Sequence, residues 1–196
     1  DKLNVFDAVT ILRDRMGRGG TDPGMGNPKA LNQLIAHHAV VFKPTNLLVW
    51  VSTNPYQLGK FVAYDLKKIF SGTISPDSLD MEIIESGLTI PADTFLYSRE
   101  YSNYKKYLQM TGELGTYLRD RKTIPDSFET SYIETNPMLY LTYYNLGNYF
   151  YEIGYYKKAF DYYQLALSKD VAGEEERNKI IRQTKKAHKK QRNVHS

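Results

Sequence analysis

The residues best suited to acid–base or metal chemistry in this chain are its four histidines. His37 and His38 are adjacent, while His188 and His195 lie near the C-terminal end. Adjacent side chains on a strand point to opposite faces, so His37 and His38 are predicted not to act on one ligand together. The four also lack a metal-ligand spacing such as HxxxH. A histidine in an apolar strand is more often a satisfied core residue than a ligand or base, so we predict no metal site.

Nucleophilic and phosphate chemistry have no clear candidate either. The chain contains no cysteine, which excludes disulfides and a cysteine nucleophile within it. Its serines stand in no GxSxG context. The glycine-rich residues 17–26 follow a predicted helix, whereas phosphate-binding loops follow a strand and precede a helix, and they contain no GxGxxG pattern. We interpret them as a flexible connection, and we assign no catalytic residue, metal or cofactor to the chain.

Positive charge is concentrated at the C-terminal end. Residues 174–196 hold eight lysines or arginines and three glutamates, a net charge of +5, while the whole chain carries +4. Glutamates in the first turn of a predicted helix and cations toward its end complement the helix dipole. Because no aromatic residue is interleaved, we predict a solvated helix and no nucleic-acid partner. The longest apolar stretches, such as residues 47–51, are far shorter than the ~20 residues of a membrane-spanning helix, so no span is predicted.

The N-terminal part of the chain is predicted to form a helix and a small sheet. Asn4 and Asp7 have the spacing of a capping box, and apolar residues recur at helical spacing over residues 4–15. Residues 34–42 and 47–53 are typical of strands, and the turn at residues 43–46 joins them as a hairpin. Residues 61–66 are a candidate third strand. Because the hairpin is apolar at nearly every position, we expect both faces to be covered by layers that this chain hardly supplies.

After a polar link through Pro76 and Pro91, the composition changes to helix formers and tyrosine. Fifteen of the seventeen tyrosines lie between residues 97 and 163. A stripe at helical spacing predicts a helix from about residue 93 to 121, ended by Pro125; it consists of Tyr97, Tyr101, Tyr104 and Leu108. Such a stripe is a packing surface more often than a binding site, because tyrosine can bury its ring and keep its hydroxyl in water.

Residues 140–173 carry the most specific local motif. They resemble one 34-residue tetratricopeptide repeat at the signature positions Tyr143, Leu146, Gly147, Phe150, Ala159, Tyr163 and Ala166. Val171 replaces the usual terminal proline, and no second copy precedes the motif. A lone repeat must pack on other elements, so residues 174–191 are expected to form a capping helix. The resemblance places Tyr144, Asn148 and Tyr151 on the groove face, where they either pack against the rest of the protein or bind a peptide.

A second resemblance concerns residues 27–66. The segments AHHAVVF, LVWV and NPY in this region are similar to the C-terminal sheet of bacterial proteins related to the acyl-coenzyme A:6-aminopenicillanic acid acyltransferase family. This resemblance implies an αββα sandwich and an N-terminal cysteine nucleophile, freed by autoproteolysis, whose own α-amino group is the base. Because the chain begins with Asp1 and has no cysteine, we expect the nucleophile on an upstream segment or on a separate polypeptide. No catalytic residue is carried over.

Together these patterns predict an α+β chain. Residues 1–75 are expected to form a partial sheet region of an αββα-type sandwich, and residues 76–196 an all-helical lobe with the tetratricopeptide-like pair. The predicted function is the non-catalytic C-terminal portion of an acyltransferase or amide hydrolase, partnered by its upstream catalytic segment. The alternative is a tetratricopeptide-type interaction module with a peptide or protein partner. Only the family resemblance bears on location, and it favours an extracytoplasmic bacterial protein.

Overall fold

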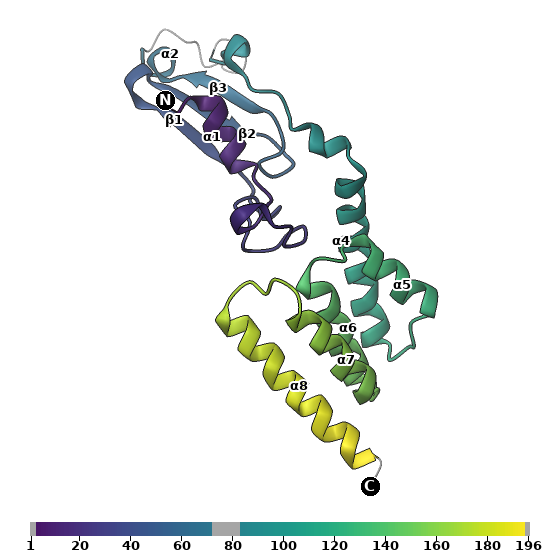
Figure 1. The fold of residues 1–196 in the computed structure, drawn as a ribbon. Helices are drawn as coiled ribbons and strands as arrows, with labels where there is room; N and C mark the ends of the chain where they lie inside the picture. The colour runs from purple at the N-terminus through teal and green to yellow at the C-terminus, as the bar shows by residue number, and fades with distance from the viewer. Residues whose placement is uncertain (1–2, 72–82, 195–196) are drawn as a thin grey trace. The chain divides into compact units, whose positions relative to one another are not determined.

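The computed structural model describes residues 3–71 and 83–194. In these residues a three-stranded antiparallel sheet precedes a largely helical region of about five helices, which confirms the predicted α+β class. The chain divides into two compact units, residues 1–15 with 30–98 and residues 16–29 with 99–196. We name the first the sheet unit and the second the helical unit (Figure 1).

The sheet unit begins with helix α1 (Val5–Leu12), which the sequence predicts. The Asn4 side chain accepts hydrogen bonds from the backbone N–H groups of Phe6 and Asp7, and the Asp7 carboxylate accepts one from the backbone of Asn4. This is the predicted capping box. The helix ends earlier than predicted, with Arg13 as its C-cap.

Strands β1 (Val40–Lys43), β2 (Leu48–Ser52) and β3 (Phe61–Asp65) form the sheet in the order β1-β2-β3. The predicted hairpin turn is present as the short 3-10 turn Pro44–Asn46, and the third strand is confirmed. Helix α2 (Leu66–Phe70) follows β3. The outer edge of β3 bridges to Ile84 and Ile90.

The first predicted strand is wrong over residues 34–39. Leu34 has a φ of 54°, and its backbone N–H donates to the Asn32 side chain at 3.1 Å, a local turn that competes with a strand. His37 and His38 therefore lie outside the sheet and are both exposed, so the prediction of core histidines is also wrong.

One face of the sheet is covered by α1 (Figure 1). Val9 of α1 lies 1% exposed against Trp50, whose indole N–H donates to the Leu88 carbonyl at 2.9 Å. The buried core around this contact consists of Val9, Ala39, Trp50, Phe61, Ala63 and Ile90.

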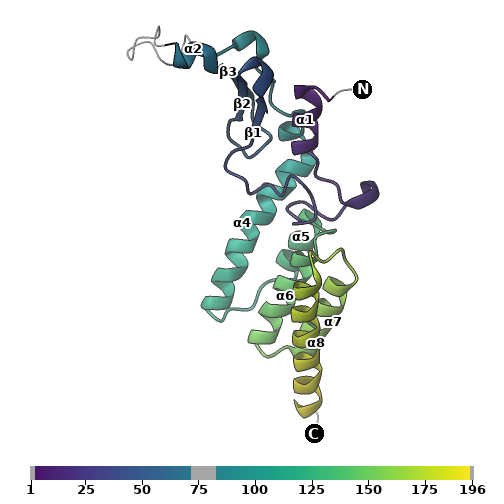
Figure 2. The same cartoon turned by 90° about the vertical axis from the view of Figure 1, so that its left-hand side faces the viewer.

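The helical unit contains α4 (Arg99–Arg119), α5 (Asp126–Thr135), α6 (Tyr140–Glu152), α7 (Tyr156–Leu167) and α8 (Glu174–Val194). Successive helices pack on one another, and α6, α7 and α8 lie side by side (Figure 2). The turn between α6 and α7 places Gly154 at a φ of 88°, which favours glycine. The predicted tail helix is confirmed and extends to Val194.

The predicted tyrosine helix differs from the structure in its start and in its packed face. Residues 94–97 form a separate 3-10 turn, and α4 begins only at Arg99. Tyr97 is therefore outside the helix and 85% exposed, and Leu108 is 45% exposed. The buried stripe is instead Tyr101, Tyr104, Tyr107, Met110 and Leu114. Pro125 does not end this helix but stands at the N-cap of α5, which the sequence analysis missed.

Residues 23–26 of the glycine-rich loop are buried or half-buried in the helical unit, so the prediction of a flexible connection is wrong for them, whereas residues 18–22 are exposed. The Asn27 side chain is fully buried and donates to the carbonyls of Pro23 and Asp170 at 2.8 and 2.7 Å. The Asn136 side chain binds both the N–H and the C=O of Met25. Bonds between residues more than a hundred positions apart cannot be read from loop composition.

Candidate functional site

The predicted groove residues of the helical unit lie along one side of α6. Tyr144 is only 8% exposed, with its ring 5.9 Å from that of Tyr163. Lys179 of α8 lies over the Tyr144 ring, with its ammonium 5.6 Å from the ring centroid. Asn148 accepts a hydrogen bond from the Tyr163 hydroxyl at 2.9 Å. Two of the predicted binding residues therefore already have partners inside the unit.

Tyr151 is the third predicted groove residue. It is half-buried, and its ring makes an edge-to-face contact with Tyr156 at a centroid distance of 5.4 Å. Around the nearby α6–α7 turn a shallow hollow of about 300 Å³ is lined by Gly154, Tyr155, Tyr156, Lys157, Lys158, Asp161 and Gln191. Peptide binding at Tyr144, Asn148 and Tyr151 stays a prediction.

A charged cluster that the sequence analysis missed joins α5 to α7. The Tyr162 hydroxyl donates to one oxygen of Glu129, and the Lys158 ammonium lies 2.6 Å from the other. Lys158 also lies 4.2 Å from the centroid of the Phe150 ring, on which Tyr162 stacks. Burial, followed by the bond to Glu129, raises the pKa of Tyr162. Its phenol therefore stays protonated at neutral pH, and the cluster holds two helices together.

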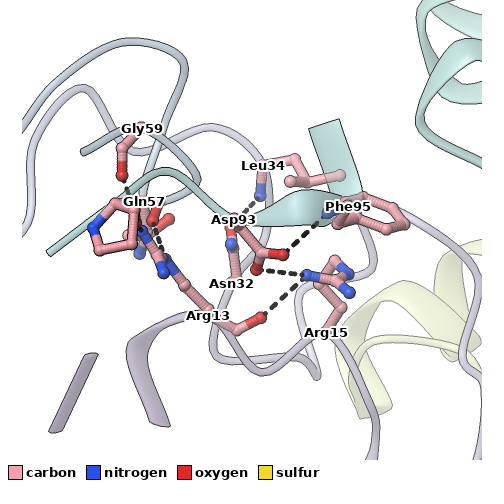
Figure 3. Close-up of polar contacts among 9 residues, drawn as sticks. Arg13, Arg15, Asn32, Leu34, Gln57, Gly59, Asp93 and Phe95 are labelled. Carbon is pink, nitrogen blue, oxygen red and sulfur yellow. Dashed lines mark hydrogen bonds and ion pairs between the residues drawn. The ribbon is translucent and has the colours of Figure 1, made fainter. Parts of the chain in front are cut away.

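The sheet unit has a second polar cluster, centred on Arg13 (Figure 3). The Arg13 guanidinium donates to the carbonyl of Gln57 at 3.1 Å and to those of Gly59 and Pro91 at 2.8 Å each. Burial lowers the pKa of Arg13. The side chain thus ties the end of α1 to the loop after β2 and to the segment after Ile90.

Arg15 continues this cluster toward residues 93–95 (Figure 3). Its guanidinium lies 3.3 Å from the Asp93 carboxylate and stacks 3.5 Å from the centroid of the Phe95 ring. The other Asp93 oxygen accepts the N–H of Phe95 at 2.9 Å. The two arginines and Asp93 bind protein groups in this way, which is a structural role.

Two buried polar atoms near this cluster have no hydrogen-bond partner in the described residues: Asn32 Nδ2 and Gln57 Oε1. Asn32 is 1% exposed and its backbone N–H donates to Asp14 at 2.7 Å, while the Gln57 backbone binds Arg13. An unpaired buried group costs about 1–3 kcal/mol. The sheet unit therefore retains two unpaired polar atoms within the described residues.

The sheet face opposite α1 is also apolar. Strand register places two cross-strand rows on it, Val40–Val51–Val62 and Phe42–Val49–Tyr64. Val40 and Phe42 on the edge strand β1 are 43% and 65% exposed, whereas Val49 on the central strand is 8% exposed. The other members of the two rows are half-buried. The covering layer was predicted to come from outside this chain, so the exposure of Val40 and Phe42 does not contradict that prediction. Neighbouring exposed apolar side chains on a sheet face are typical of a surface that packs on another layer.

Catalytic groups are sparse. In the described residues no group of three histidine or acidic side chains is placed to hold a metal ion. The imidazole Nδ1 of His38 lies 3.4 Å from the Ser52 carbonyl oxygen. None of the helices within residues 3–71 and 83–194 is long and apolar enough to span a membrane.

Comparisons with known proteins give no match to a family model, to a curated protein or to a solved structure.

Proposed function

We propose that the chain is the non-catalytic C-terminal portion of an acyltransferase or amide hydrolase that acts on non-peptide amides or acyl thioesters. A cysteine on an upstream segment, or on a separate polypeptide, would supply the nucleophile, with its own α-amino group as base. The residues of this chain would form one side of the sandwich that holds that segment.

The observation that supports this proposal is the apolar sheet face opposite α1, on which Val40 and Phe42 are exposed. Helix α1 covers one face, while the rows Val40–Val51–Val62 and Phe42–Val49–Tyr64 present only apolar residues and tyrosine on the other. A sheet with a helix on one face and apolar residues on the other face has the arrangement of half an αββα sandwich. In such a sandwich a second sheet packs about 10 Å away. The resemblance of residues 27–66 to acyltransferase relatives supports the same assignment.

Expression of this chain with and without the coding sequence that precedes Asp1 tests the proposal. We expect hydrolysis of a panel of penicillins, bile salts and simple acyl amides only when a cysteine-bearing segment of roughly 200–400 residues is present. Replacement of that cysteine by alanine should abolish turnover. Turnover by the purified chain alone would contradict the proposal, because the chain contains no cysteine.

A matched pair of substitutions tests the interface itself. Phe42 on the apolar face opposite α1 and Phe6 on α1 are 65% and 59% exposed. Phe42→Lys places a charge where the second sheet would pack, so it should weaken co-purification of the two segments by about tenfold or more. Phe6→Lys should leave co-purification unchanged. Equal effects of the two variants would mean that the apolar face opposite α1 is not the interface.

A tetratricopeptide-type interaction module without an enzymatic role is the second candidate. The close crossing of α6 and α7 favours it: a Cβ on Gly147 would lie 2.6 Å from the Tyr163 ring. Further repeats in the coding sequence before Asp1, with no cysteine-bearing segment, would support this module. Loss of peptide binding in Tyr151→Ala, with an unchanged thermal unfolding curve, would then locate the binding face on α6.

A further inference from the structure

The outer side of α8 carries a line of four cations. Arg182, Lys185, Lys186 and Lys189 follow the spacing i, i+3, i+4 and i+7, and all four are exposed. At a rise of 1.5 Å per residue they span about 10 Å along the helix. We name these four residues the cationic ridge.

The ridge lies opposite the packed side of the helix. Ile180, Thr184 and Ala187 of α8 are buried, at 0%, 8% and 0% exposure. With about 100° of rotation per residue, the mean direction of the ridge is roughly 180° from that of these three residues. The apolar side of α8 is therefore used within the helical unit, and the ridge faces outward as its rigid outer surface.

The ridge is not neutralised within the described chain. None of its four side chains makes an ion pair or a hydrogen bond within residues 3–71 and 83–194. On α7, by contrast, Lys157 is paired with Asp161 four residues later. Like charges at i, i+3 and i+4 repel and weaken a helix. A surface with interspersed positive and negative charges also keeps a protein soluble, and its charges do not repel one another. Solubility alone therefore does not require four neighbouring unpaired cations.

The chemistry of the ridge fits a phosphate-bearing surface. Three of the four residues are lysines, whose compact charges on flexible stems bind phosphate without the paired geometry that carboxylate recognition uses. Residues 174–196 contain no phenylalanine, tyrosine or tryptophan, so the helix has no ring on which nucleic-acid bases could stack. Clusters of four or more lysines and arginines on an amphipathic helix are typical of anionic lipid surfaces.

We propose that the cationic ridge docks the protein on an anionic lipid bilayer by electrostatic attraction. The contact is peripheral, because the apolar residues of α8 are occupied inside the unit and cannot enter the bilayer. Docking therefore depends on the lipid charge and is reversed by salt. This inference does not depend on the enzymatic role proposed above.

Sedimentation with lipid vesicles tests the proposal. We expect the full chain to bind vesicles of 70% phosphatidylcholine and 30% phosphatidylglycerol at roughly 50 mM NaCl, and to be released at roughly 500 mM. Vesicles of phosphatidylcholine alone should not bind. Replacing all four ridge residues with glutamine should weaken partitioning by at least about a hundredfold, since each cation near such a surface contributes about fivefold. Glutamine also favours helix, so the helical circular dichroism should be retained.

The matched control removes four other exposed lysines, Lys43, Lys60, Lys67 and Lys106, again by glutamine. It changes the net charge by the same amount but should keep most of the vesicle binding. An equal loss in both variants would overturn the proposal in favour of an effect of net charge. Failure to bind anionic vesicles at low salt would also overturn it. Tighter, ridge-dependent binding to a 30-base-pair duplex than to the vesicles would overturn the choice of lipid.

Discussion

The helical unit and the sheet unit differ in how completely they satisfy their own buried groups. In the helical unit the fully buried Tyr132 shares its hydroxyl with Thr111 and Asn145, at 3.0 and 3.1 Å. The Tyr149 hydroxyl donates to Lys122 at 2.6 Å and accepts the N–H of Ile124 at 2.9 Å. Tyr132 and Tyr149 are thus packing residues whose hydroxyls bind inside the unit, as the interpretation of a packing surface predicts.

The sheet unit is less complete. It leaves Asn32 Nδ2 and Gln57 Oε1 unpaired within the described residues, and it exposes Phe42 on an apolar face. The loop after β2 and the segment after Ile90 are held by hydrogen bonds from the Arg13 guanidinium to backbone carbonyls. Among the described residues, the two buried side-chain atoms without a hydrogen-bond partner both lie in the sheet unit.

The substitution Arg13→Ala should produce the largest difference in stability between the two units. It leaves the carbonyls of Gln57, Gly59 and Pro91 without their donor, and we expect the sheet unit to lose about 3 kcal/mol. Trp50 is the single tryptophan of the chain and lies in the sheet unit, so its fluorescence in urea follows this unit alone. The urea midpoint measured by far-ultraviolet circular dichroism, a signal dominated by the helices, should shift much less than the midpoint measured by fluorescence. Equal shifts of both signals would show that the two units unfold together.

Gly147→Leu is expected to destabilise the helical unit by about 1–3 kcal/mol. A Cβ at this position would lie 2.6 Å from two Tyr163 ring atoms, so overpacking outweighs the gain in helix propensity of roughly 0.8 kcal/mol. Gly112→Ala is the control, because no heavy atom lies within 4 Å of the Cβ that it would gain. This control should stabilise α4 by about 0.8–1 kcal/mol. A Gly147→Leu protein as stable as the parent in thermal unfolding would refute the close crossing of α6 and α7.

Alkaline pH should unfold the helical unit through its buried phenols. Burial is the first cause of the raised pKa values of Tyr107, Tyr162 and Tyr163. A phenol whose pKa is raised in the folded state stabilises that state at pH values below the ordinary tyrosine pKa near 10. This contribution to the free energy of unfolding is lost as the pH rises toward the raised pKa. Helical circular dichroism should therefore fall above about pH 10. In Tyr162→Phe the dependence of stability on pH in this range should be weaker; an unchanged dependence would exclude Tyr162 as a contributor.

Lys157→Ala should have the smallest effect, less than about 0.5 kcal/mol. Its salt bridge to Asp161 spans 3.0 Å, but both side chains are more than half exposed, at 71% and 54%. Exposed pairs of this kind contribute little because water and salt screen them. Thermal unfolding in low and high salt measures the effect. A loss above 1 kcal/mol would mean that Lys157 has packing contacts beyond this pair.

Elements whose signals are local could be predicted from the amino-acid sequence. The capping box of Asn4 and Asp7, the turn at Pro44, the short strand from Phe61 and the helices of residues 140–167 and 174–194 all depend on residues a few positions apart. Cap chemistry, turn residues and hydrophobic period act over such distances, so they can be read without the tertiary structure.

Which residues are buried, and which surfaces stay exposed, depends on contacts between segments that are distant in the sequence. Asn27 binds Asp170 across 143 positions, and Arg13 binds Pro91 across 78, so neither the packed glycine loop nor the arginine cluster has a local signal. The packed face of α4 likewise depends on its neighbouring helices, which bury Tyr107 and leave Leu108 exposed. Burial is a property of contacts between distant segments, and the period of one segment specifies only which residues share a face.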